Sequence, residues 1–143
     1  MPPLPRQSTY RIRVGAVAIG GGAPVSVQTM ANTDTRDAAA SVAQARACFE
    51  AGADIVRFAV PDAAAAAALA EIKRALGPDR AIVADIHFDH RLALAALEAG
   101  VDGLRINPGN IGSAAKVREV AAADLDGADA DAMGGLAGKR LHG

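Results

Sequence analysis

Tryptophan is absent from this chain, and the other large aromatic residues are scarce, with one tyrosine and three phenylalanines among 143 residues. The hydrophobic fraction of 51% is high, but much of it is alanine, which favours helices and buries little area. We therefore expect valine, isoleucine and leucine to form most of the core of a single domain. The alanine-rich run at residues 63–68 is expected to be helix surface.

An excess of charge of either sign is also missing, because 15 lysines and arginines stand against 16 aspartates and glutamates. This balance gives no reason to expect binding to nucleic acid or to an anionic membrane surface. No apolar run is long enough to span a bilayer, and the proline-rich start lacks the apolar centre of a secretory signal. We expect a soluble, cytoplasmic protein with a flexible stretch over residues 1–9.

Cysteine occurs once, at Cys48. A single cysteine excludes an internal disulfide framework, and it excludes an iron–sulfur cluster whose ligands come from this chain alone. Cys48 stands within a helical pattern and is expected to be a small buried hydrophobic residue.

Segments with the patterns of strands and helices alternate along the chain. Residues 10–14 and 17–19 predict a small β-hairpin ahead of the main fold. After it we expect strands at 25–30, 54–60, 81–86 and 101–106, and helices at 37–51, 63–76, 89–99 and from 114 onward. Connections this short imply parallel strands with right-handed crossovers, and therefore an α/β fold.

One nine-residue segment occurs twice, 48 positions apart: residues 50–58 (EAGADIVRF) are echoed at residues 98–106 (EAGVDGLRI). This offset corresponds to two strand–helix units, and alternate strands of a TIM (β/α)₈ barrel contribute side chains to the same interior layer. The repeat therefore predicts that Arg57 and Arg105 lie at the same height and face one site. A doubly wound open sheet is the competing architecture, but the glycines at residues 20–22 precede the first main strand, where a phosphate turn does not belong.

The composition changes after Val120, because no β-branched residue follows it and residues 122–143 are mostly alanine, aspartate and glycine. No fifth strand is expected there, and the segment is predicted to be irregular or disordered. We therefore expect residues 10–121 to form the amino-terminal half of a TIM-barrel domain, with about four strand–helix units, and residues 122–143 to form an atypical tail.

Two of the predicted strands end in polar side chains that alternate, Asp85 with His87 and Arg105 with Asn107. Strand side chains have a period of two, so each pair projects from one face. Ligands bind at the carboxyl ends of parallel strands in such folds. Together with Arg57, these groups predict a phosphate or diphosphate site whose guanidinium groups are oriented by the carboxylate.

Each of these residues also has a structural interpretation. Arg57 and Arg105 are equally suited to be ion-pair partners of Asp85 that hold the barrel rim together. His87 suits the role of a hydrogen-bonded structural residue at a strand end. Asn107 opens the sequence Asn-Pro-Gly-Asn, which is first of all a turn.

Four segments carry a resemblance to a known family: residues 25–33 (VSVQTMANT), 52–57 (GADIVR), 83–89 (VADIHFD) and 104–112 (LRINPGNIG). In this order they closely resemble the amino-terminal part of 4-hydroxy-3-methylbut-2-en-1-yl diphosphate synthase, of the non-mevalonate isoprenoid pathway. The likeness covers about residues 10–120.

The resemblance implies an iron–sulfur oxidoreductase that opens the ring of 2-C-methyl-D-erythritol 2,4-cyclodiphosphate by a two-electron reduction, with ferredoxin or flavodoxin as electron donor. It implies that Arg57, His87, Arg105 and Asn107 hold the cyclodiphosphate, with Asp85 beside them. The [4Fe-4S] ligands of the family, three cysteines and a glutamate, lie in a separate carboxy-terminal domain that caps the partner subunit's barrel in a homodimer.

The sequence lacks the second half of such a barrel and the cluster domain. We therefore expect a truncated or frame-shifted fragment that supplies part of the diphosphate site, cannot bind the cluster alone and is inactive alone. Two other functions stay open: a half-barrel binding or assembly module, and a different phosphate-binding TIM-barrel enzyme, such as a pterin-synthase-like protein.

Overall fold

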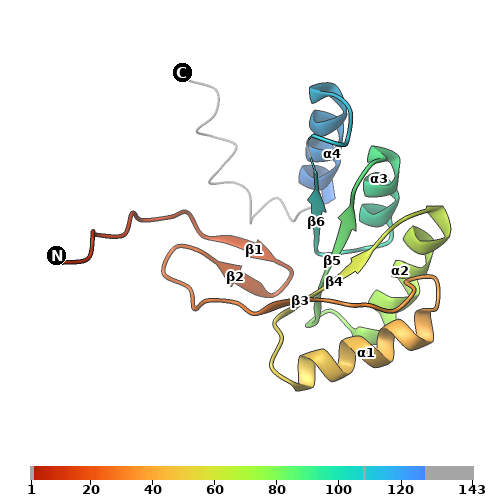
Figure 1. Cartoon of the computed structure of the whole chain (residues 1–143), viewed down its shortest axis with the longest axis horizontal. Coiled ribbons are helices and arrows are strands. Elements are labelled where there is room, and N and C mark those ends of the chain that lie inside the picture. The colour runs from red at the N-terminus through yellow and green to blue at the C-terminus, as the bar shows by residue number, and fades with distance from the viewer. Residues whose placement is uncertain (1, 108, 128–143) are drawn as a thin grey trace.

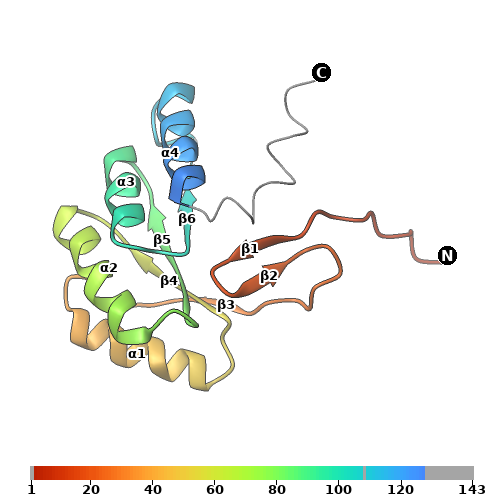
Figure 2. The same ribbon diagram turned by 180° about the vertical axis from the view of Figure 1, so that it is seen from behind.

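A computed structural model describes residues 2–107 and 109–127 of the chain (Figures 1 and 2). It contains a hairpin, four further strands and four helices. These elements are, in chain order, β1 (Ile12–Val14), β2 (Val17–Ile19), β3 (Gln28–Met30), α1 (Ala38–Glu50), β4 (Ile55–Ala59), α2 (Ala63–Leu76), β5 (Ala81–Ile86), α3 (His90–Glu98), β6 (Gly103–Ile106) and α4 (Ala114–Gly127).

The main sheet has the strand order β3-β4-β5-β6, and all three neighbouring pairs are parallel. A helix follows each strand, and the four helices lie together on one side of the sheet while the β1–β2 hairpin lies on the other (Figure 1). This arrangement confirms the predicted α/β class, the four parallel strand–helix units of a partial barrel and the hairpin that precedes them.

The hairpin covers the amino-terminal part of the sheet face that points away from the helices. Its apolar side chains Val14, Val17 and Ile19 pack against Ile55, Ala81 and Val83, near the starts of β4 and β5. Because the hairpin covers the part of this face near the amino ends of the strands, only the part near their carboxyl ends is left for polar side chains.

The core lies between the sheet and the helices, and alanine contributes more to it than its size suggests. Ala65 and Ala66 on α2 and Ala93 and Ala96 on α3 are fully buried, so the expectation that residues 63–68 are helix surface is wrong at two positions. A methyl side chain lets a helix backbone approach the sheet closely, and this gain in contact replaces the area that a larger side chain would bury.

The repeated segment first ends a helix. Gly52 and Gly100 follow α1 and α3 with φ angles of 107° and 92°, which an L-residue rarely adopts. The next residue in each copy donates its main-chain N–H back across the last turn, Ala53 to Cys48 O at 3.0 Å and Val101 to Ala96 O at 3.4 Å. This is the Schellman pattern of helix termination, and it appears at the same place in both copies.

The repeated segment then starts a strand. Asp54 accepts the main-chain N–H of Val27 through Oδ2 at 2.8 Å and donates its own N–H to Val27 O. Asp102 makes the same two contacts with Ile82, at 2.9 and 3.0 Å. The aspartate therefore sets the register between its own strand and the preceding neighbour in both copies.

Several element boundaries differ from the prediction, and the largest differences are at β3 and α4. β3 begins at Gln28 rather than at residue 25, because its ladder follows β4, which begins at Ile55, and Val25 is 94% exposed. α4 continues to Gly127, so residues 122–127 are helical rather than irregular, consistent with the high helix propensity of alanine. The rest of the predicted tail, residues 128–143, lies outside the described residues.

No helix within the described ranges has the length and apolarity needed to cross a lipid bilayer.

Candidate functional site

Asp85 is the centre of the polar region at the carboxyl ends of the strands. Only 3% of this residue is exposed, and it lies beside Ala59 of β4 and Arg105 of β6 in the sheet ladder. Arg105 Nη1 donates to Asp85 Oδ1 at 3.2 Å, and His87 Nε2 lies 3.7 Å from Asp85 Oδ2. The structure therefore brings three of the predicted site residues together on one face of the sheet.

The cluster has a buried side, formed by the Asp85 carboxylate, and a side that is open to solvent. A buried charge requires a partner, and Arg105 supplies it, while the guanidinium and the His87 imidazole are themselves about half exposed. Asp85 therefore orients the Arg105 and His87 side chains from the buried side and leaves their outer edges open to solvent. The geometry fits the predicted orienting role of Asp85, and the same ion pair also fits the structural interpretation of Arg105.

Arg57 projects from the same face, two ladder positions before Ala59 and Asp85. Its neighbours in the ladder are Met30 on β3 and Val83 on β5. The Nε atom of Arg57 is buried and has no hydrogen-bond acceptor within the described part of the chain, and Nη2 makes only a 3.9 Å contact with Met30 Sδ. A buried donor without a protein acceptor is rare in folded proteins and calls for another acceptor, such as a water molecule, an ion or a ligand.

The ladder also tests whether Arg57 and Arg105 share a layer. Arg57 is aligned with Val83 and through it with Gly103, so Arg105 stands two residues further along β6. A TIM barrel has eight tilted strands and a shear of 8, which is an offset of one residue per strand. Two strands apart, the same height along the barrel axis is therefore reached two residues further along the chain. The register therefore agrees with a shared layer. Strand β5 separates the two arginines, and their convergence on one ligand stays a prediction.

Asn107 makes the contacts of a turn residue. Its Oδ1 accepts the main-chain N–H of Gly109 at 3.1 Å, and its carbonyl oxygen accepts the N–H groups of Asn110 and Ile111, each at 3.0 Å. These contacts fit the structural interpretation of the residue, and its predicted contact with a ligand stays a prediction.

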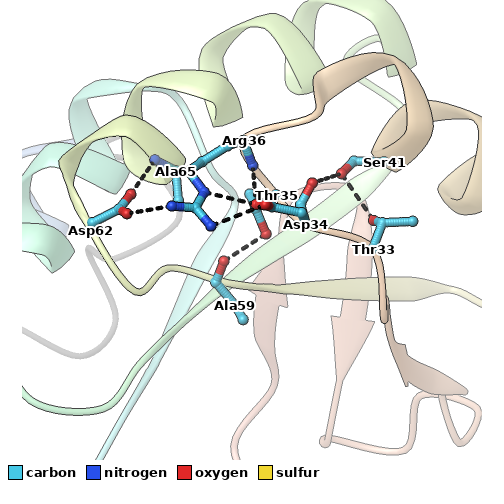
Figure 3. Close-up of polar contacts among 8 residues, drawn as sticks. All are labelled: Thr33, Asp34, Thr35, Arg36, Ser41, Ala59, Asp62 and Ala65. Atoms are coloured by element: carbon cyan, nitrogen blue, oxygen red, sulfur yellow. Dashed lines mark hydrogen bonds and ion pairs between the residues drawn. The ribbon is translucent and has the colours of Figure 1, made fainter.

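The loops after β3 and β4 are held together by a polar network that sequence reasoning did not predict (Figure 3). Arg36 donates through Nε and Nη2 to both carboxylate oxygens of Asp34, at 2.9 and 3.0 Å, and through Nη1 to Asp62 at 3.1 Å. Thr35 Oγ1 donates to the carbonyl oxygen of Ala59 at 2.6 Å. Because Ala59 is the ladder partner of Asp85, this network fixes the rim directly beside the site.

The same Asp-x-Arg arrangement recurs after β5. Asp89 accepts the Arg91 main-chain N–H at 2.9 Å and receives Nε and Nη2 of the same residue at 3.0 and 2.9 Å. The hydrogen bonds from Arg91 lower the pKa of Asp89 to about 2. The signal in the sequence was the spacing itself, Asp34 with Arg36 and Asp89 with Arg91, at the start of two helices.

A cavity of about 650 Å³ lies beside His87, between the loops that follow β4 and β5. Most of its lining is apolar, and apart from His87, just after β5, the polar residues stand at the starts of α2 and α3. The lining residues are Ala59, Val60, Pro61, Asp62, Ala63, His87, Phe88, Asp89, Arg91, Leu92 and Ala95.

The residues of this chain do not fit an iron–sulfur cluster. Such clusters are held mainly by several cysteine thiolates, and Cys48 is the one cysteine of the sequence. Cys48 is partly buried on α1 and packs against the core, as predicted. Among residues 2–107 and 109–127, no group of three or more histidine, cysteine, aspartate or glutamate side chains is arranged to hold a metal ion.

Comparison with known proteins identifies the family of the fold. Residues 9–129 match the GcpE TIM-barrel domain family. Over 121 residues the chain is 56% identical to the 4-hydroxy-3-methylbut-2-en-1-yl diphosphate synthase (flavodoxin) of Acinetobacter baumannii strain ATCC 17978, which covers 85% of this chain and 32% of that relative. The enzymes of the same name from Psychrobacter arcticus and Acidithiobacillus ferrooxidans are 56% and 58% identical, over 84% and 82% of this chain and 32% of each relative.

The chain thus spans about a third of the length of these curated relatives, at its amino-terminal TIM-barrel region. The resemblance read from four short motifs is confirmed over most of the sequence, because the family match extends from the hairpin into α4. The chain belongs to the family of the GcpE TIM-barrel domain.

Proposed function

We propose that this chain supplies part of the cyclodiphosphate-binding site of a 4-hydroxy-3-methylbut-2-en-1-yl diphosphate synthase. The observation that carries the proposal is the buried Nε of Arg57, a donor without an acceptor in the described residues, on the sheet face that also bears Arg105 and His87. A diphosphate oxygen is the acceptor that such a guanidinium group fits best, since it accepts paired hydrogen bonds from planar donors.

Each side chain has a distinct part in this proposal. Arg57 and Arg105 bind the diphosphate oxygens, and His87 donates a hydrogen bond to the same group. Asp85 completes the site as the buried carboxylate that positions Arg105 and His87. Asn107, whose side-chain oxygen accepts the Gly109 N–H, contributes its side-chain amide N–H groups from the turn that follows β6.

The full reaction belongs to the longer protein of the family. There the bound cyclodiphosphate is opened by a two-electron reduction, for which a [4Fe-4S] cluster in another domain supplies the electrons. The names of the relatives include flavodoxin, which supports flavodoxin over ferredoxin as the donor. We propose that this chain alone binds the ligand without turning it over, and the expected homodimer and cytoplasmic location stay predictions.

Isothermal titration of the 143-residue chain with 2-C-methyl-D-erythritol 2,4-cyclodiphosphate tests the proposal. A hydrogen bond to a charged group contributes about 1.5–3 kcal/mol, so Arg57→Gln and Arg105→Gln are each expected to weaken binding by about tenfold or more. Arg74→Gln is the matched control, because Arg74 lies in the last turn of α2, remote from the carboxyl ends of the strands. Equal affinity of all four proteins contradicts the proposal, and binding of a pterin in place of the cyclodiphosphate supports the pterin-enzyme alternative.

One observation favours the second candidate function, an assembly module. Within the described residues, β3 and β6 each pair on one side only, so each has an open edge that can accept another strand. Association of the chain through these edges is tested at the end of the Discussion.

A further inference from the structure

We infer that the cavity beside His87 receives the hydrocarbon chain of an amphiphilic diphosphate ester whose diphosphate group lies on the site proposed above. The inference rests on the proposed function for the diphosphate group and on the cavity for the chain. The ligand class is a diphosphate ester with an apolar chain.

The position of the cavity joins it to the anion site. Ala59 and His87 both line the cavity, and both stand at the carboxyl ends of strands beside Asp85. From there the cavity continues over the ends of β4 and β5 to the first turns of α2 and α3. A ligand whose charged end contacts His87 can therefore place its other end in the cavity without crossing the sheet.

The size and lining of the cavity fit a hydrocarbon chain. Its volume of about 650 Å³ lies within the range of small-molecule sites, and Val60, Pro61 and Leu92 give it apolar walls. Phe88 is 73% exposed at its edge, with its ring centroid 6.0 Å from that of His87. A large exposed aromatic side chain at the mouth of an apolar cavity gains burial when an apolar ligand enters.

The carboxylates at the rim are already paired and do not make the cavity a cation site. Both Asp89 oxygens are bound by Arg91, and the Asp62 oxygens are taken by the Ala65 main-chain N–H and by Arg36. The carboxylates therefore have little capacity left for a cationic ligand.

Three probes separate the two parts of the ligand: pyrophosphate carries only the charged group, geraniol only the chain, and geranyl diphosphate both. Each buried CH₂ adds about 0.8 kcal/mol, about a fourfold gain in affinity, so the chain is expected to bind geranyl diphosphate at least tenfold more tightly than pyrophosphate. Ala63→Phe places a large side chain in the cavity and is expected to reduce this difference while leaving pyrophosphate binding unchanged. Ala64→Phe is the matched control, because Ala64 is exposed on the same helical turn and does not line the cavity.

The outcomes distinguish this inference from the proposed function. Equal affinities for geranyl diphosphate and pyrophosphate overturn the cavity inference and leave the diphosphate site standing. If neither pyrophosphate nor geranyl diphosphate binds, both the cavity inference and the diphosphate site are overturned. If geraniol binds but neither pyrophosphate nor geranyl diphosphate does, the link between the cavity and the diphosphate site is overturned. Should Ala63→Phe fail to fold by circular dichroism, NMR on the unsubstituted chain decides: Phe88 ring and Leu92 methyl signals must shift with geranyl diphosphate and not with pyrophosphate.

Discussion

At the scale of single residues, the site depends on carboxylates that are held by arginines. Asp85 is buried and paired with Arg105, whereas Asp34 is exposed, Asp89 is partly exposed, and each binds an arginine two residues later. The period of two in a strand was enough to predict that Asp85 and Arg105 share a face. It was not enough to predict the Asp-x-Arg pairs, because their contacts depend on loop conformations that a local pattern does not determine.

The Asp89–Arg91 pair makes a prediction about titration. Arg91→Gln removes two side-chain hydrogen bonds to the carboxylate and is expected to raise the pKa of Asp89 from about 2 toward its ordinary value of 3.8. The main-chain N–H of residue 91 still donates, so part of the lowering remains. Carboxyl ¹³C chemical shifts measured against pH report the midpoint, and Arg74→Gln is the control. An unchanged midpoint in Arg91→Gln would contradict the contact.

The same pair sets a direction for stability against pH. The pKa of Asp89 is lower in the folded protein than the ordinary value of 3.8 expected for the unfolded chain. The pair therefore stabilises the fold above about pH 3.8, and this contribution is lost as the pH falls through about 2. In Arg91→Gln the loss of stability is expected to be visible near neutral pH and to vanish at the acid end of this window.

At the scale of elements, the sequence assigned a role only to Arg57 and Arg105 in the nine-residue segment that recurs after 48 positions. The structure shows what the other residues of this segment do. Its glycines end helices, and its aspartates align neighbouring strands. Helices at 63–76 and a strand at 81–86 were predicted to the residue, because strong periodicity and clear breakers bounded them. The start of β3 was not predicted correctly. An edge strand extends only as far as its one neighbouring strand pairs with it, whereas the apolar pattern extends further.

The two aspartates of the repeat are expected to differ in their effect on stability. Asp102 also accepts Lys73 Nζ at 2.6 Å, and these side chains are 13% and 16% exposed. Asp102→Ala leaves that ammonium without its carboxylate and is expected to lower the free energy of unfolding by about 3 kcal/mol. Asp54→Ala, at an exposed position, removes one acceptor of a main-chain N–H and is expected to cost about 1 kcal/mol.

Urea denaturation of the two variants measures the difference. Lys73→Met in the Asp102→Ala background serves as the control, because it removes the uncompensated charge and is expected to recover part of the loss. Equal destabilisation by Asp54→Ala and Asp102→Ala would show that the Lys73 contact contributes nothing.

At the scale of the whole molecule, the order of strands and helices was predictable, because short connections between parallel strands leave few topologies. The position of the hairpin under the sheet was not, because its apolar face shows only that it packs somewhere. The cavity was likewise beyond the sequence, since it arises from two loops that meet only after α2 and α3 have packed.

The open edges of the sheet lead to a prediction about association. β3 has a neighbour only at β4 within the described residues, and Val25 and Val27, just before it, are 94% and 55% exposed. An exposed edge next to apolar side chains is a template for pairing with another strand. We therefore expect the 143-residue chain to associate with a second copy at micromolar concentrations, which sedimentation velocity detects as a concentration-dependent sedimentation coefficient.

Charge at the edge should oppose this association. Val25→Lys with Val27→Lys is expected to shift the equilibrium toward monomer by at least tenfold, because paired edges then bring like charges together. Leu4→Lys is the matched control, since Leu4 is 90% exposed and remote in sequence from the sheet. A monodisperse monomer at high concentration in the unsubstituted chain would remove the assembly function, whereas an effect confined to the double variant would place the contact at β3.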